Sequence, residues 1–81
     1  MYVKSITIYT QPECPPCEIT KMFLKDYGFS FEQKDIKKDP KAMKELTQTY
    51  HSYSTPTVVI ENEVISGFNL EKLKELLDIE E

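Results

Sequence analysis

The chain has 81 residues, of which 40% are hydrophobic, and its net charge at pH 7 is -4. This length suits one small domain, residues 1–81, because it leaves too little interior for a second core. The negative charge argues against a nucleic-acid surface, and no apolar run approaches the ~18 residues needed to cross a bilayer. We therefore expect a soluble and cytoplasmic protein, and we also expect a monomer.

The N-terminal part of the chain predicts a strand followed by an amphipathic helix. Apolar and β-favouring residues predict a largely buried strand at residues 2–9. The helix is expected to run from Pro16, which suits a first helical position, to Tyr27, with Gly28 as its C-terminal cap. Its inward stripe is expected to consist of Ile19, Met22, Phe23 and Tyr27.

A second strand and a second helix are predicted next. Apolar and polar residues alternate over residues 29–36, which predicts a strand near the edge of the sheet. Asp39 as a cap and Pro40 at the first helical position open a helix that continues to about Tyr50. The residues expected to face inward are Met43, Leu46 and Tyr50.

The last part of the chain predicts a hairpin and a third helix. Residues 57–60 and 64–66 flank a short turn, which predicts two antiparallel strands. Asn69 then caps a helix, and residues 79–81 are expected to be a frayed tail. The residues of this helix that are expected to face inward are Leu70, Leu73, Leu76 and Leu77. The order β-α-β-α-β-β-α predicts an α/β fold, with a four-stranded mixed sheet flanked by three helices and a parallel first strand pair.

Two cysteines, Cys14 and Cys17, lie at the junction of the first strand and the first helix. Unpaired N–H groups and the positive end of the helix dipole favour a thiolate there, and can lower a cysteine pKa from about 8.5 towards about 7. Cys14 gains most because it is nearer to the helix N-terminus. The pattern predicts a redox-active pair beyond the carboxyl end of the first strand, where open α/β sheets place their sites.

Other roles for a Cys-x-x-Cys pair stay open at this point. A structural disulfide would close so small a loop that little entropy is removed from the unfolded chain. Zinc needs four ligands, but the chain has only these two cysteines and one histidine, His51. Inert buried cysteines fit poorly with the surrounding prolines and charges. A metal or iron–sulfur cluster shared between two chains is a further alternative.

Three motifs together resemble the thioredoxin-fold redoxins, and within them the glutaredoxin-like group. The resemblance covers essentially the whole chain. The motifs are Tyr9-Thr10-x-Pro12-x-Cys14-x-x-Cys17, Ser54-Thr55-Pro56-Thr57 and Ser66-Gly67-Phe68. A Cys-x-x-Cys after the first strand, combined with Thr-Pro at the start of the third, is a strong signal because chance rarely places both.

The resemblance implies a thioredoxin-like fold of the glutaredoxin type and a dithiol–disulfide oxidoreductase without a bound cofactor. Cys14 is then the attacking residue and Cys17 the resolving one, and the two cycle through a disulfide. The Thr55–Pro56 bond is expected to be cis and to lie beside that disulfide, with the Thr55 backbone pairing with the substrate. The substrate-binding residues implied in this way are Gln11, Thr55, Pro56, Gly67 and Phe68.

The identity of the electron donor divides the glutaredoxin-like group. Members that use glutathione usually carry a lysine before the motif, an aromatic residue between the cysteines, and a Gly-Gly pair followed by an acid. Here the corresponding residues are Gln11, Pro16 and Gly67-Phe68-Asn69. The Ser-Gly-Phe segment resembles instead the redoxins that thioredoxin reductase reduces with NADPH. We therefore expect protein disulfides as substrates, with ribonucleotide reductase a candidate partner and glutathione the alternative donor.

Overall fold

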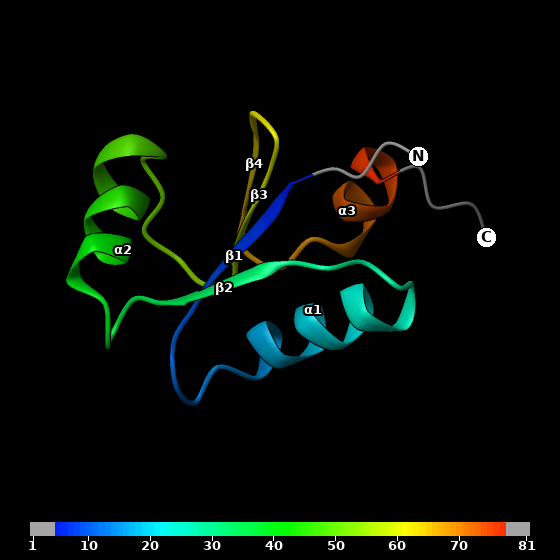
Figure 1. Ribbon diagram of the computed structural model, residues 1–81, viewed down its shortest axis with the longest axis horizontal. Coiled ribbons are helices and arrows are strands. Elements are labelled where there is room, and N and C mark those ends of the chain that lie inside the picture. Colours follow the sequence, from blue (N-terminus) through cyan, green and yellow to red (C-terminus); the bar gives the residue numbers. More distant parts are fainter. Residues whose placement is uncertain (1–4, 78–81) are drawn as a thin grey trace.

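A four-stranded mixed sheet forms the centre of the computed structural model, which describes residues 5–77. The strands are β1 (Ile6–Thr10), β2 (Glu32–Asp35), β3 (Thr57–Ile60) and β4 (Glu63–Ser66), in the spatial order β2-β1-β3-β4. β2 is parallel to β1, whereas β3 is antiparallel to both of its neighbours (Figure 1). The parallel first pair, the hairpin and the edge position of the second strand are confirmed.

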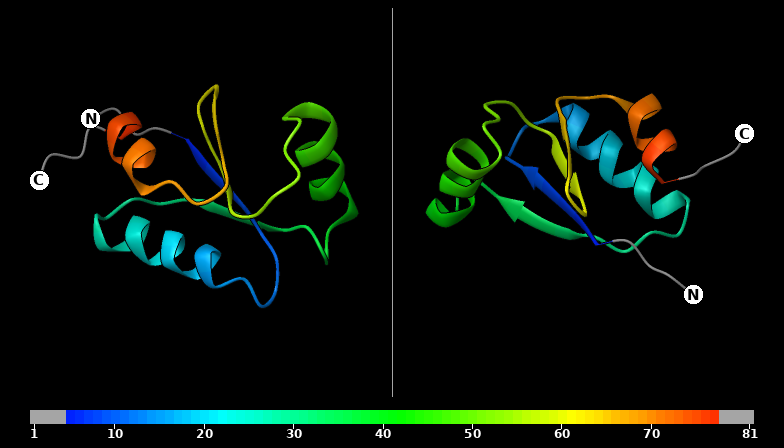
Figure 2. Two further views of the ribbon diagram at one scale, coloured as in Figure 1. Left: turned by 180° about the vertical axis from the view of Figure 1, so that it is seen from behind. Right: turned by 90° about the horizontal axis from the view of Figure 1, so that it is seen from above.

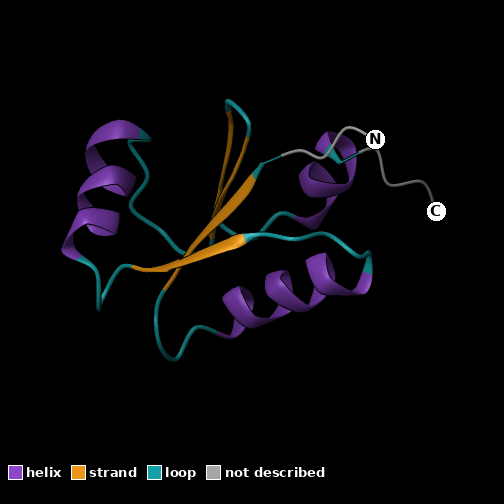
Figure 3. Cartoon of the chain, viewed as in Figure 1, coloured by secondary structure: helices purple, strands orange, loops and turns teal. Residues whose placement is uncertain are grey.

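Helices cover both faces of this sheet. One face carries α1 (Pro15–Asp26) and α3 (Leu70–Leu76), and the other carries α2 (Pro40–Lys44) with its continuation η1 (Glu45–Thr49). The right-hand view of Figure 2 shows this division, and Figure 3 shows the helices around the strands. The predicted α/β fold is therefore confirmed. Among residues 5–77, no helix is both long and apolar enough to span a membrane.

Alternating side chains of the strands supply a core on each face of the sheet. Ile8 of β1 points towards α1 and α3, where it joins Leu24 and Leu73 in the larger cluster. The next residue, Tyr9, points to the opposite face and packs with Leu46 of η1. Because successive side chains of a strand leave opposite faces, β1 holds both helical layers at once.

The Glu45 carboxylate ties η1 to two strands. Its Oε1 accepts hydrogen bonds from the Tyr9 hydroxyl, at 3.0 Å, and from the Lys34 ammonium, at 2.8 Å. The hydrogen bond between Lys34 and Glu45 lowers the pKa of the Glu45 carboxyl and raises the pKa of the Lys34 ammonium. Burial, reinforced by Glu45, raises the pKa of the Tyr9 phenol well above its ordinary value. Tyr9 therefore remains a neutral donor in this network at neutral pH.

The second strand is shorter than predicted, because part of its backbone ends the preceding helix. The Phe29 N–H donates to the Leu24 carbonyl at 2.9 Å, so it is not available to the sheet, and β2 begins only at Glu32. Phe29 and Phe31 instead pack against the larger core cluster. The prediction of a strand over the whole of residues 29–36 was therefore wrong at its start.

The ends of the other elements agree more closely with the sequence. β1 begins at Ile6, and residues 2–4 of the predicted first strand lie outside the described residues, as does the predicted tail at 79–81. Asp39 and Asn69 are N-caps whose side chains accept hydrogen bonds from N–H groups of the first helical turn, as predicted. Gly28 follows α1 with φ of 78°, a left-handed conformation that suits glycine at a helix end.

The predicted inward stripe of α1 was wrong for Ile19, Met22 and Tyr27, whereas Phe23 packs against the larger core cluster as predicted. The buried residues are Cys17, Thr20 and Leu24, whereas Ile19 and Met22 are 48% and 61% exposed. Phe23 is half-buried and Tyr27 is exposed. The polar Thr20 can face the sheet because its hydroxyl donates to the Pro16 carbonyl at 2.9 Å, one turn earlier. This internal hydrogen bond removes the penalty of burying the hydroxyl, which apolar spacing alone does not reveal.

The second helix does not continue as an α-helix to Tyr50. From Glu45 it is a π-helix, in which the Tyr50 N–H donates to the Glu45 carbonyl at 3.1 Å. The Thr47 hydroxyl donates to the Met43 carbonyl at 3.0 Å, a bond of the kind that bends helices. Met43, predicted to face inward, is 38% exposed.

Paired alanine substitutions in α1 test its orientation. Leu24→Ala should lower the free energy of unfolding by about 2–5 kcal/mol, because Leu24 is fully buried. Met22→Ala should change it by no more than about 0.5 kcal/mol, because Met22 is largely exposed. Urea unfolding of the two variants provides the measurement, and equal losses would show that the helix faces the sheet differently.

Candidate active site

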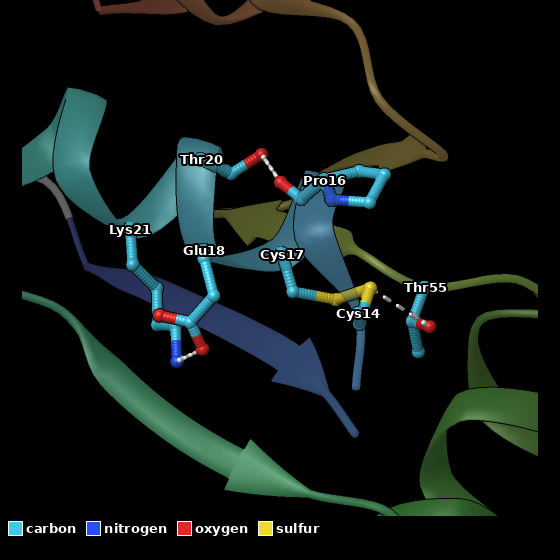
Figure 4. Close-up of polar contacts among 7 residues, drawn as sticks. All are labelled: Cys14, Pro16, Cys17, Glu18, Thr20, Lys21 and Thr55. Carbon is cyan, nitrogen blue, oxygen red and sulfur yellow. Dashed lines mark hydrogen bonds and ion pairs between the residues drawn. A yellow bond between two sulfur atoms is a disulfide. The ribbon is translucent and has the colours of Figure 1, made fainter. Parts of the chain in front are cut away.

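Cys14 and Cys17 form a disulfide at the N-terminus of α1 (Figure 4). Cys14 is the N-cap, and its carbonyl accepts a hydrogen bond from the Glu18 N–H at 3.2 Å. The helix therefore begins at Pro15, one residue before the predicted start. The disulfide lies beyond the carboxyl end of β1, as predicted, at the end of the helix where the dipole favours negative charge.

The two sulfurs differ in their access to solvent. Cys14 is partly exposed, whereas Cys17 has no exposed surface. Burial in apolar surroundings disfavours a thiolate, and the N-cap position favours one. Cys14 is thus the cysteine that a second molecule can reach, and Cys17 is the one shielded behind it.

Thr55 brings a hydroxyl to the exposed cysteine from a distant part of the chain. Its Oγ1 lies 3.7 Å from the Cys14 Sγ, and Figure 4 shows the two side chains facing each other. The Thr55–Pro56 peptide bond is cis, as predicted, and Pro56 is fully buried. The loop before β3 therefore lies against the disulfide, although the part that its backbone plays in substrate binding stays a prediction.

The segment before α3 is joined to the same loop. The Gly67 N–H donates to the Pro56 carbonyl at 2.9 Å, and φ of Gly67 is 84°. A residue with a side chain would be strained in this left-handed conformation. Phe68 follows and is 47% exposed. Gln11, the remaining predicted substrate contact, lies partly buried in the loop between β1 and α1. Binding roles for these residues remain predictions.

A cluster of four hydroxyl groups supports the Thr55–Pro56 loop and was missed in the sequence. The Ser52 Oγ lies 2.8 Å from the Thr57 Oγ1 and 2.7 Å from the Ser66 Oγ, and the Ser54 Oγ lies 3.2 Å from the same Ser66 atom. Ser52 and Thr57 are buried, so these mutual bonds satisfy hydroxyls that water cannot reach. The density of Ser and Thr at residues 52–57 is the only sequence signal of this cluster.

Thr10 presents a further buried hydroxyl, at the end of β1 and four residues before Cys14. The residue is 3% exposed, and in the described part of the chain its Oγ1 has no hydrogen-bond partner. An unsatisfied buried hydroxyl costs about 1–3 kcal/mol. In the oxidised site, no hydrogen bond from the described residues offsets this cost for the Thr10 hydroxyl.

The described residues show no sign of a metal centre within one chain. Across residues 5–77, no group of three or more His, Cys, Asp or Glu side chains is arranged to hold a metal ion. The cysteine pair is instead closed as a disulfide. The reactive groups at this site are therefore the two cysteine thiols, which the structure shows oxidised to a disulfide.

The fold and the Cys-x-x-Cys disulfide define a thioredoxin-fold redoxin. The family model described as Glutaredoxin matches residues 6–65 of this chain. The protein belongs to the glutaredoxin family, and its cysteine pair fits a thiol–disulfide oxidoreductase.

Relatives of similar length support this assignment. The Gene 56 protein of Mycobacterium phage D29 is 35% identical over 74 residues, covering 90% of this chain and 82% of the relative. The crystal structure of the thioredoxin-like protein BC3987 has a TM-score of 0.87 and 54% identity, covering 89% of this chain and 99% of that one. The glutaredoxin-like protein NrdH-redoxin from Escherichia coli has a TM-score of 0.80 and 30% identity, covering 89% and 93%.

Titration of the reduced protein tests the asymmetry of the two thiols. We expect the pKa of Cys14 to lie well below that of Cys17, because of the helix N-terminus and the burial of Cys17. Thr55→Val should raise the Cys14 pKa by about half a unit to one unit, because the thiolate loses a hydroxyl donor.

Thiolate absorbance or pH-dependent alkylation of single-cysteine variants measures both values. Thr55→Ser is the matched control, because it keeps the hydroxyl and should leave the Cys14 pKa close to that of the parent protein. A Cys14 pKa no lower than that of an ordinary free cysteine would contradict the electrostatic account.

Proposed function

We propose that this protein is a small dithiol–disulfide oxidoreductase that carries electrons to disulfides of other proteins. The observation that carries the proposal is the pairing of a partly exposed Cys14 at a helix N-terminus with a fully buried Cys17. The accessible sulfur of Cys14 is suited to attack a disulfide of a second molecule. The buried sulfur of Cys17 is suited to react with Cys14 within the same chain.

The reduced protein transfers two electrons in two exchange steps. The Cys14 thiolate attacks one sulfur of the substrate disulfide, the substrate S–S bond breaks, and the departing sulfur leaves as a thiolate that takes up a proton. Cys14 is then joined to the substrate by a mixed disulfide. Cys17 loses its proton and attacks the Cys14 sulfur, which releases the second substrate thiolate and forms the Cys14–Cys17 disulfide.

The fold supports this division of labour. The Cα atoms of the two cysteines are 5.2 Å apart, so the second step needs no large movement of the backbone. Burial keeps Cys17 from competing for the substrate disulfide. Thr55, at 3.7 Å from the Cys14 sulfur, is well placed to donate to the thiolate that forms there.

Thioredoxin reductase, using NADPH, is the proposed electron donor. One support is the similarity to the Escherichia coli NrdH-redoxin, a glutaredoxin-like protein described as having a thioredoxin-like activity profile. The other is the presence of Gln11, Pro16 and Gly67-Phe68-Asn69 where glutathione-using relatives place charged, aromatic or diglycine contacts. Disulfide-containing proteins, ribonucleotide reductase among the candidates, are the proposed substrates. Cytoplasmic location and a monomeric state stay predictions from the sequence.

Turnover with two donor systems distinguishes the proposal from its alternative. Reduction of a protein disulfide should be fast with NADPH and thioredoxin reductase, and at least about tenfold slower with glutathione and glutathione reductase, which is about 1.4 kcal/mol in transition-state stabilisation. Oxidation of NADPH measures both reactions. A preference for the glutathione system would identify a glutathione-coupled glutaredoxin instead.

Single serine substitutions assign the two thiols. Cys14→Ser should abolish reductase activity, because it removes the attacking sulfur. Cys17→Ser should still attack but should accumulate a mixed disulfide with the substrate, because resolution fails. Non-reducing electrophoresis and mass spectrometry detect the adduct, and trapping by Cys14→Ser in place of Cys17→Ser would reverse the assigned roles.

A further inference from the structure

Tyr53, two residues before Thr55, displays its aromatic ring to solvent. The residue is 81% exposed, the highest value recorded for a large apolar or aromatic side chain in residues 5–77. It lies in the loop between η1 and β3. No motif in the sequence had singled it out.

The backbone of Tyr53 is close to that of Thr55, whose side chain contacts the Cys14 sulfur. Two residues of chain span at most about 7 Å, so the Cα of Tyr53 lies within that distance of the Cα of Thr55. The Thr55 hydroxyl in turn lies 3.7 Å from the Cys14 sulfur. An extended polypeptide advances about 3.3 Å per residue, so a substrate strand that runs alongside residues 53–55 covers the distance from Thr55 to Tyr53 in about two residues.

Both neighbours of Tyr53 are fixed in the hydroxyl cluster. Ser52 is buried, and its Oγ contacts Thr57 at 2.8 Å and Ser66 at 2.7 Å. The Ser54 carbonyl accepts a hydrogen bond from the Thr57 hydroxyl at 2.6 Å, and the Ser54 Oγ contacts Ser66 at 3.2 Å. The exposed ring of Tyr53 is therefore carried by a backbone segment that hydrogen bonds hold on both sides.

An anchored aromatic residue is well suited to recognition. A Tyr side chain supplies a large contact area and loses little conformational entropy on binding, because it has only two rotatable side-chain bonds. Pre-ordering of its backbone lowers the entropy lost on association still further. Phe68 adds a second exposed ring on the adjoining segment, which the Gly67 N–H joins to Pro56 at 2.9 Å.

We propose that Tyr53 is a docking residue for the polypeptide that carries the substrate disulfide. It contacts an apolar or aromatic side chain about two residues from the substrate cysteine, and it plays no part in the exchange steps. This inference rests on the proposed oxidoreductase function. It predicts that Tyr53 matters for protein disulfides and not for small disulfides, which occupy only the space around Cys14 and Thr55.

The test compares two substrates with dithiothreitol as the electron source. With insulin as the protein disulfide, Tyr53→Ala should lower kcat/KM by about 5- to 30-fold, chiefly through a higher KM, as expected for a contact residue at an interface. With hydroxyethyl disulfide as the small disulfide, kcat/KM should remain within about twofold of the parent protein. Tyr53→Phe should retain most of the activity on insulin, because the ring is kept.

Tyr27→Ala is the matched control. Tyr27 is also exposed, at 43%, but it follows the far end of α1, roughly 20 Å from Cys14 along the helix. Its substitution should leave kcat/KM for insulin unchanged. Thermal unfolding and the Cys14 pKa of each variant verify that the substitutions leave the fold and the thiol intact.

The possible outcomes separate this inference from the proposed function. An active parent protein whose Tyr53→Ala variant reduces insulin equally well overturns the docking role and leaves the oxidoreductase function standing. Equal losses with insulin and hydroxyethyl disulfide also overturn it, because the residue then acts on the thiols. A loss that occurs only when thioredoxin reductase replaces dithiothreitol assigns Tyr53 to the reductase instead. A parent protein inactive on both disulfides overturns the proposed function and this inference together.

Discussion

The antiparallel pairing of β1 with β3 is the constraint on which the candidate site depends. Tyr9, near the end of β1, is the register partner of Thr57, the first residue of β3. The chain leaving β1 towards the cysteines therefore starts beside the chain that enters β3 after Thr55 and Pro56. Backbone hydrogen bonds fix this register, and a shift by one residue would turn the side chains of β3 to the opposite faces of the sheet.

The hydroxyl cluster extends this constraint from the strands to the loops. Ser66 ends β4, and its hydroxyl contacts both Ser52 and Ser54. The segment that leads to Phe68 is thereby connected to the loop that carries Thr55. Such short bonds between small side chains leave little freedom for adjustment, which keeps the Thr55 loop in one geometry beside the disulfide.

The two cysteines are subject to different physical effects, although only two residues separate them in the sequence. The N-cap position exposes Cys14 to the helix dipole, whereas the inward face of α1 buries Cys17 completely. Thr20 and Leu24 continue that inward face, so the burial of Cys17 follows from the packing of the whole helix against the sheet. A change in the packing of α1 is therefore expected to alter the redox chemistry without touching either sulfur.

The sequence alone determined the order of the elements, the helix caps and the position of the cysteine pair at a strand–helix junction. These features depend on local patterns, such as Asp39 before a proline or Asn69 before an amphipathic run, which are visible over a few residues. The cis Thr55–Pro56 bond was expected only through the family resemblance, because most such bonds are trans.

The tertiary structure alone decided which face of α1 is buried, where β2 begins, and how the hydroxyl cluster is assembled. Each of these depends on contacts between residues distant in sequence, or on competition for one hydrogen bond. The Phe29 N–H ends a helix and so cannot extend a strand. Thr20 can face the sheet because its hydroxyl donates to the Pro16 carbonyl, which removes the penalty of burying it. The Thr55 hydroxyl and the Cys14 sulfur come within 3.7 Å of each other because β1 and β3 pair, and no local pattern encodes that contact.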